Sequence, residues 1–255
     1  NDNEDIPALF FVMDKITSKD KSFKKTFLLH SLQEPEVSGN TTTIKRDTDG
    51  YNGKLVNQTL YPADARIEKV GGPGKQWFVS GKNYVPRGAD EQSTDMGWGR
   101  VEISPKSQNE TDYFLNAMYM TDADKTVSAQ AELIENDTIL GAKLDSTVAV
   151  FVKDKARAQS DISFDVAGDG EFRILVAGIQ EGGWDVKKDG VSVGEQIATK
   201  DGGTVYFKGG AGSYTLSYTN PSAQREKQEI VIPEHEGITV KINSKYMYTD
   251  VAPVK

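Results

Sequence analysis

Histidine is scarce in this 255-residue chain, which contains only two. One of them, His30, ends the apolar run "TFLLHS", and Asp14 lies in the preceding apolar run "ALFFVMDKI". Imidazole and carboxylate groups both bind zinc, and neighbouring strands can direct two such side chains to one point. If the two runs pair as a hairpin, we expect His30 to point into a sandwich or to its rim, within reach of Asp14. Because structural zinc takes four ligands, the pair predicts an incomplete zinc site; alternatively, Asp14 caps a turn and His30 is an ordinary strand residue.

Aromatic and basic side chains suggest a second kind of chemistry, the binding of sugars. Trp77 and Trp98 could stack on sugar rings through their π faces, although packing in the core is the alternative role. Lysines crowd the first expected turn, where they could meet an acidic glycan or form a solvated turn; they are Lys15, Lys19, Lys21, Lys24 and Lys25. His235, among acidic residues in "IPEHEG", is expected to be a solvated loop residue. No residue of the chain is predicted to be catalytic.

Composition narrows the classes of function. The formal net charge of −8 argues against a dedicated nucleic-acid binder, which needs a basic face to neutralise phosphates. For the same reason, an acidic polysaccharide could bind only at a local basic patch. The chain has no cysteine, which excludes disulfides, thiol catalysis and cysteine-ligated metal sites. No run of about 18 apolar residues occurs, so we expect no transmembrane span.

The elements that must position these side chains are short strands. Runs rich in β-branched and aromatic residues are separated by Gly, Asn, Asp or Pro, and no long segment has a helical period. This pattern predicts an all-β fold, with a large antiparallel β-sandwich followed by a smaller β-sandwich-like unit. We place the sandwich at residues 1–152 and the smaller unit at 153–220. Residues 221–255 would be a linker and the start of a third unit.

Several segments resemble the C-terminal β-sandwich portion of the heparinase II/III-like polysaccharide lyases. The most specific is "GKLVNQTLYPADARIEKVGGPGKQWFVSGKNY", in which "QTLYP" precedes a "VGGPG" turn and an aromatic strand. "WGRVEISP", "DYFLNAMYM" and, near the end, "DGGTVYFKGGAGSYTLSY" continue the resemblance.

This resemblance implies part of a secreted lyase that cleaves uronic-acid-containing glycans, such as glycosaminoglycans or alginate, by β-elimination. It also implies an upstream helical toroid that carries the main catalytic residues. Since no helical array occurs in this sequence, we expect the chain alone to be catalytically incomplete. Related lyases hold a structural metal with histidine and aspartate, which is compatible with Asp14 and His30.

The end of the chain suggests an exported protein. "ITVKINSKYMYTDVAPVK" resembles the opening of the stalk repeat called the copper amine oxidase N-terminal-like domain, which implies no copper chemistry. That repeat is common on exported Gram-positive proteins, so we expect a secreted or cell-surface location. The alternative function is therefore a non-catalytic carbohydrate-binding or structural spacer module of a cell-surface protein.

Overall fold

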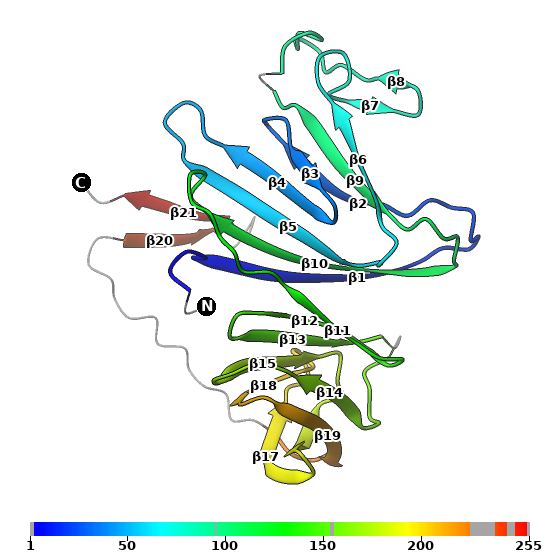
Figure 1. Ribbon diagram of the computed structural model, residues 1–255, viewed down its shortest axis with the longest axis vertical. Helices are drawn as coiled ribbons and strands as arrows, with labels where there is room; N and C mark the ends of the chain where they lie inside the picture. The colour runs from blue at the N-terminus through cyan, green and yellow to red at the C-terminus, as the bar shows by residue number, and fades with distance from the viewer. Residues whose placement is uncertain (1–2, 95, 154–155, 225–237, 244–247, 254–255) are drawn as a thin grey trace. The chain divides into compact units, whose positions relative to one another are not determined.

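The computed structural model describes residues 3–94, 96–153, 156–224, 238–243 and 248–253 (Figure 1). Every regular element among them is a β-strand, which confirms the all-β class. The chain divides into two units, Asn1–Gln224 and Arg225–Lys255. None of the described residues belongs to a helix that could cross a membrane.

Four sheets of three or more strands, numbered I to IV here, build the first unit. Sheet I has the order β2 (Phe27–Ser31), β9 (Gly99–Ser104), β6 (Arg66–Gly71). Sheet II has the order β1 (Ala8–Thr17), β10 (Thr111–Thr121), β5 (Gly53–Tyr61), β4 (Thr41–Arg46), β3 (Glu36–Ser38). Sheet III has the order β11 (Glu132–Glu135), β12 (Ile139–Leu144), β13 (Thr147–Val152), β15 (Phe172–Ala177), β18 (Thr204–Gly209). Sheet IV has the order β14 (Ile162–Val166), β19 (Gly212–Asn220), β16 (Gly182–Lys188), β17 (Val191–Ala198).

The sheets are stacked in the order I, II, III, IV, with a hydrophobic core between each neighbouring pair (Figure 1). Leu29 and Ile103 of sheet I pack with Met118 of sheet II. On the other face of sheet II, Leu115 packs with Leu140 of sheet III. Sheet II is therefore covered on both faces, whereas none of the other three large sheets of the described chain packs on the outer face of sheet I.

The inner sheets do not show the simple alternation of a half-buried strand. In β10 the successive residues Phe114, Leu115, Asn116 and Ala117 are all buried, because the two faces of the strand meet different cores. Asn116 is the polar exception among them. Its carboxamide oxygen accepts hydrogen bonds from the Thr59 hydroxyl at 2.9 Å and from the Asn57 amide at 3.2 Å on the neighbouring strand β5, whereas its own amide nitrogen has no partner among the described residues.

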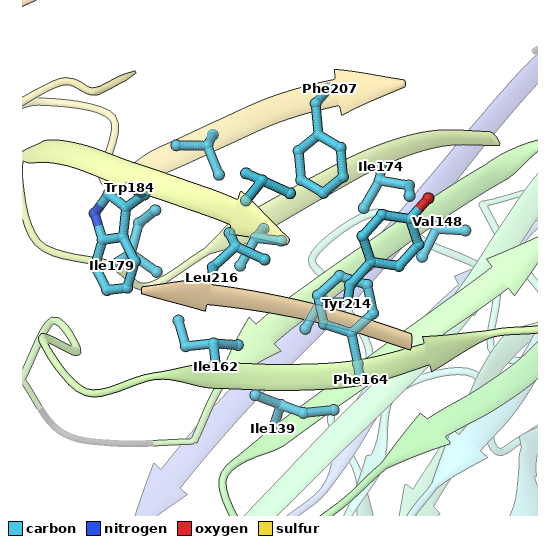
Figure 2. Close-up of a cluster of buried hydrophobic side chains, with 14 of the residues drawn as sticks. Ile139, Val148, Ile162, Phe164, Ile174, Ile179, Trp184, Phe207, Tyr214 and Leu216 are labelled. Atoms are coloured by element: carbon cyan, nitrogen blue, oxygen red, sulfur yellow. The ribbon is translucent and has the colours of Figure 1, made fainter. Parts of the chain in front are cut away.

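Sheets III and IV form a second sandwich around the largest core of the chain. Figure 2 shows Trp184 and Tyr214 of sheet IV among aliphatic side chains from both sheets. The Trp184 indole donates a 2.9 Å hydrogen bond to the Gln180 carbonyl, which satisfies its only polar group. Phe164 stacks on Tyr214 with ring centroids 5.5 Å apart.

Sheet III contains the one parallel strand pair of the described sheets, β13 with β15. The other strand pairs there are antiparallel, as expected. The boundary expected between residues 152 and 153 falls between β13 and β15. Sheet III therefore contains strands from both sides of that boundary.

The second unit contains the antiparallel pair β20 (Ile238–Asn243) and β21 (Tyr248–Pro253). Much of the expected linker and stalk-like segment, 221–255, lies outside the described residues, and so does His235. The resemblance of this segment to a stalk repeat stays a prediction.

Candidate functional site

A pocket of about 700 Å³ lies on the outer face of sheet I. We call it the aromatic pocket. The short hairpin of β7 (Phe78–Val79) and β8 (Lys82–Asn83), inserted between β6 and β9, forms one wall, and the ends of β2 and β9 form the other. Its lining residues are His30, Ser31, Leu32, Gln76, Trp77, Val79, Tyr84, Met96, Gly97, Gly99 and Arg100.

His30 reaches this pocket because of the strand period. Leu29 and Ser31 are buried towards sheet II, so His30 between them points to the opposite, outer face and is exposed. It pairs across the strands with Arg100 of β9. His30 therefore does not point into the sandwich, and of the two expected positions only the rim remains open to it.

Arg100 fastens the β7–β8 hairpin to the sheet. Its Nη2 donates a 2.7 Å hydrogen bond to the carbonyl oxygen of Phe78 in β7. Its Nε and Nη2 also donate to Oε1 of Glu102, at 2.9 and 2.7 Å. Burial by itself would raise the pKa of Glu102, but hydrogen bonds from Lys24 and Arg100 outweigh it and hold this pKa below its usual value. Glu102 is thus a stable anion that balances the charge of Arg100.

The hairpin presents Trp77 and Tyr84 on its two arms. Asn83 fixes the arms, because its side-chain oxygen accepts a 2.9 Å hydrogen bond from the Trp77 backbone amide. The turn at Ser80 and Gly81 has positive φ at both positions, which suits a tight two-residue hairpin. Tyr84 is 57% exposed and Trp77 is half-buried, so both rings are available at the pocket.

Two buried polar atoms at the pocket have no hydrogen-bond partner among the described residues. They are Oε1 of Gln76, which lines the pocket, and Oγ of Ser31, whose side chain points towards sheet II beneath it. The amide nitrogen of Gln76 is well used, since it donates to the carbonyls of Glu91 and Ser93 at 3.0 and 2.7 Å. Because buried polar groups are normally satisfied, the unpaired Oε1 of Gln76 is an exception among the described residues that a buried water molecule would satisfy.

Trp98 is close to the pocket but does not line it. It packs against Gly71 so tightly that a Cβ built on Gly71 would lie 2.4 Å from Cε3 of the indole. Nζ of Lys69 also lies over the indole, 5.6 Å from the ring centroid. These contacts favour the packing role for Trp98 and leave Trp77 as the tryptophan at the pocket.

The two expected zinc ligands lie on different sheets. Asp14 is on β1, which pairs with β10, whereas His30 is on β2, which pairs with β9. The hairpin pairing that was expected to bring them together is therefore wrong. No group of three or more His, Asp or Glu side chains suited to a metal occurs among the described residues. These positions do not fit a zinc ion together, and a zinc site in this protein stays a prediction.

Of the residues that line the pocket, sequence reasoning named only His30 and Trp77 and missed, among others, Gln76, Tyr84 and Arg100. A signal for Gln76 and Tyr84 exists in "QWFVSGKNY", where Ser-Gly between short strand-like runs indicates a tight hairpin. That turn necessarily brings Trp77 and Tyr84 near each other. Arg100 gives no such signal, because its place beside His30 depends on pairing between strands that are far apart in the sequence.

One part of the chain matches a known protein family. Residues 133–218 match the heparinase II C-terminal domain. The matched segment runs from β11 into β19 and so comprises sheets III and IV. This confirms the resemblance to the C-terminal portion of heparinase II-like lyases, although the stalk-like segment is not part of the match. No curated protein matches the chain.

Proposed function

We propose that this chain is the C-terminal β portion of a secreted polysaccharide lyase that cleaves uronic-acid-containing glycans by β-elimination. In this proposal the chain binds glycan at the aromatic pocket, and catalysis belongs to another part of the lyase. The heparinase II C-terminal domain at residues 133–218 supports the first statement. The second statement, that the chain binds glycan, is supported by one pocket that is lined by Trp77 and Tyr84 together with His30 and Arg100.

The aromatic pocket has the chemistry that a sugar ring needs. The C–H faces of a pyranose are apolar and pack on aromatic rings such as those of Trp77 and Tyr84. Ring hydroxyls require a few polar groups at fixed places, and His30 and Gln76 supply them in the wall. The volume of about 700 Å³ lies in the range of ordinary ligand pockets.

The charge balance of the pocket supports binding without catalysis. β-Elimination requires a base at the C5 proton and a group that neutralises the neighbouring carboxylate, so that the carbanion-like state becomes accessible. Arg100 is the cation of this pocket, but its guanidinium is already paired with the carboxylate of Glu102. It can orient a uronate carboxylate by hydrogen bonding, yet it brings little net positive charge to it.

Glycan binding by purified chain tests the proposal. Titration with uronate oligosaccharides, followed by calorimetry, should show that Trp77→Ala weakens binding by about tenfold, the loss of ~1.4 kcal/mol of stacking. Tyr206→Ala is the matched control, because Tyr206 is an exposed aromatic residue of sheet III that is not in this pocket. The absence of any binding by the unaltered chain would instead favour a structural spacer.

Catalytic incompleteness is tested separately. The unsaturated uronate product of β-elimination absorbs in the ultraviolet, so the purified chain can be assayed directly. We expect no rise in absorbance with uronate polymers. Turnover by the chain free of other polypeptides would contradict this part of the proposal, and loss of that turnover in His30→Ala or Tyr84→Phe would move catalysis to the aromatic pocket.

A further inference from the structure

A second pocket, of about 330 Å³, lies between the segment before β2 and the segment after β9. We call it the lysine pocket. Five of its lining side chains are cationic and one, Asp112, is a carboxylate. The cationic residues are Lys21, Lys24, Lys25, Arg66 and Lys106. The whole chain carries a net charge of −8, so this local excess of positive charge is opposite in sign to the net charge of the molecule.

A buried ion pair holds the two walls of the lysine pocket together. Nζ of Lys25 lies 2.9 Å from Oδ2 of Asp112, and the two side chains are only 4% and 7% exposed. Lys25 also donates to the carbonyl oxygen of Asn109, whose side chain in turn donates to Asp112 at 3.0 Å. The ammonium group of Lys25 is therefore already paired with Asp112 and Asn109 and is not available to a ligand.

Hydrogen bonds also shape the segment that carries Lys21. The carboxylate of Asp20 accepts two bonds of 2.8 Å from Ser22, one from the backbone amide and one from the hydroxyl. These bonds lower the pKa of Asp20, so the turn keeps its charge and its shape. The backbone amide of Phe23 donates to the Asp20 carbonyl at 3.1 Å, which closes the turn. Lys21 and Phe23 thus project from an organised turn.

The remaining cations differ in how far they are already neutralised. Lys24 pairs with Glu102 at 2.9 Å, and Arg66 pairs with Glu68 at 2.6 Å. Lys21 and Lys106 are exposed and form no ion pair with any residue in the described part of the chain. Phe23, at the rim, is 60% exposed and offers an aromatic face beside them. The pocket therefore combines two uncompensated cations with one apolar surface.

We propose that the lysine pocket binds the sulfate or carboxylate groups of an acidic glycan chain, as a subsite separate from the aromatic pocket. Two uncompensated ammonium groups beside an exposed ring suit an anionic substituent on a sugar, whose ring can pack on Phe23. A nucleic acid is disfavoured, because its regular phosphates need an extended basic face, whereas the chain as a whole has a net charge of −8.

The location of the two pockets makes a single occupant geometrically reasonable. Gly99 and Arg100, at the start of β9, line the aromatic pocket, whereas Ser104, at its end, lines the lysine pocket. At the rise of an extended strand, these ends are roughly 17 Å apart. The aromatic pocket lies on the outer face of sheet I, and the lysine pocket lies at the other end of β9, where Asp112 of sheet II also lines it. A glycan of several sugar units could therefore occupy both, while a short fragment would occupy one.

Affinity for an anionic oligosaccharide at several salt concentrations tests this inference. The variant is Lys21→Ala with Lys106→Ala, and the probe is a heparin oligosaccharide long enough to span both pockets. We expect affinity to fall about tenfold, as for the loss of two exposed charged contacts. The slope of log affinity against log salt should become less steep by about one to two, because fewer counterions are released. An unchanged melting temperature would show that folding is intact.

The control variant is Lys200→Ala with Lys208→Ala, two exposed lysines outside the pocket that give the same change in net charge. An equal loss of affinity in this control would overturn the inference in favour of long-range charge. So would equally tight binding of single-stranded RNA, or competition by inorganic sulfate at the concentration of the oligosaccharide. A neutral oligosaccharide should be insensitive to Lys21→Ala with Lys106→Ala, and sensitivity would also count against an anion subsite.

The same assay separates this inference from the proposed function. Trp77→Ala should weaken binding without changing the salt slope, because it removes no charge. If the lysine variant alone weakens binding, the lysine pocket stands and the aromatic pocket fails. If Trp77→Ala alone weakens binding, the reverse holds.

Discussion

Replacement of Lys25 by methionine should destabilise the first unit strongly. Lys25→Met keeps an unbranched side chain, one atom shorter, but removes its charge. It leaves the carboxylate of Asp112 buried, with the 3.0 Å hydrogen bond from Asn109 as its remaining support. Because both members of the pair are more than nine-tenths buried, solvent screens their attraction very little. Removing one partner of such a pair costs about 3–5 kcal/mol of folding free energy.

The double variant Lys25→Met with Asp112→Asn isolates the cause. Asparagine preserves the shape of Asp112 and can still accept the hydrogen bond from Asn109, so no uncompensated charge remains. We therefore expect the double variant to lose only about 1 kcal/mol. Urea unfolding at neutral pH measures both values, and Lys24→Met serves as a control because the Lys24 side chain is 57% exposed, so its ion pair with Glu102 should contribute less than about 1 kcal/mol. A loss below about 1 kcal/mol for Lys25→Met, or additive effects in the double variant, would refute the reasoning.

Three further predictions concern packing and pH. Gly71→Ala should cost about 1–3 kcal/mol, since its Cβ would lie 2.3 Å from the Trp98 carbonyl oxygen, whereas Gly53→Ala meets no atom within 4 Å and should change the melting temperature little. Trp184→Ala should cost about 3–5 kcal/mol in urea unfolding because the indole is fully buried, and Trp184→Phe should cost less. The lowered pKa of Glu102 stabilises the fold above its ordinary value of 4.5, and this contribution is lost as pH falls through the folded pKa. Glu102→Gln should therefore be less stable than the wild type at neutral pH, and the difference measured by urea unfolding should shrink below pH 4.5.

Strand content was predictable because local patterns determine it. In β14 the residues alternate between buried and exposed, as "ISFDV" suggests, since one face meets the core and the other meets solvent. The stacking of four sheets was not predictable in this way. It depends on long-range pairs such as β1 with β10 and β13 with β15, for which the sequence offers no local pattern.

The wrong hairpin between the first two apolar runs has a physical cause. Leu9, Phe11 and Met13 of β1 pack on the core between sheets II and III, so β1 must lie in sheet II. Leu29 of β2 packs on the core between sheets I and II, and β2 belongs to an outer sheet. The two runs are neighbours in the sequence but lie in different sheets, because their apolar side chains pack in different cores. His30 faces outwards as a result.

Glu102 connects the electrostatics of the two pockets. Its Oε1 accepts from Arg100 of the aromatic pocket, and its Oε2 lies 2.9 Å from Nζ of Lys24 of the lysine pocket. One carboxylate therefore engages one cation at each end of β9. The aromatic pocket is left close to neutral, while Lys21 and Lys106 keep the lysine pocket positive. A glycan whose ring stacks in the aromatic pocket would therefore gain affinity from the lysine pocket only if it carries anionic groups. The spacing between those groups and the stacked ring should decide which acidic glycans the chain prefers.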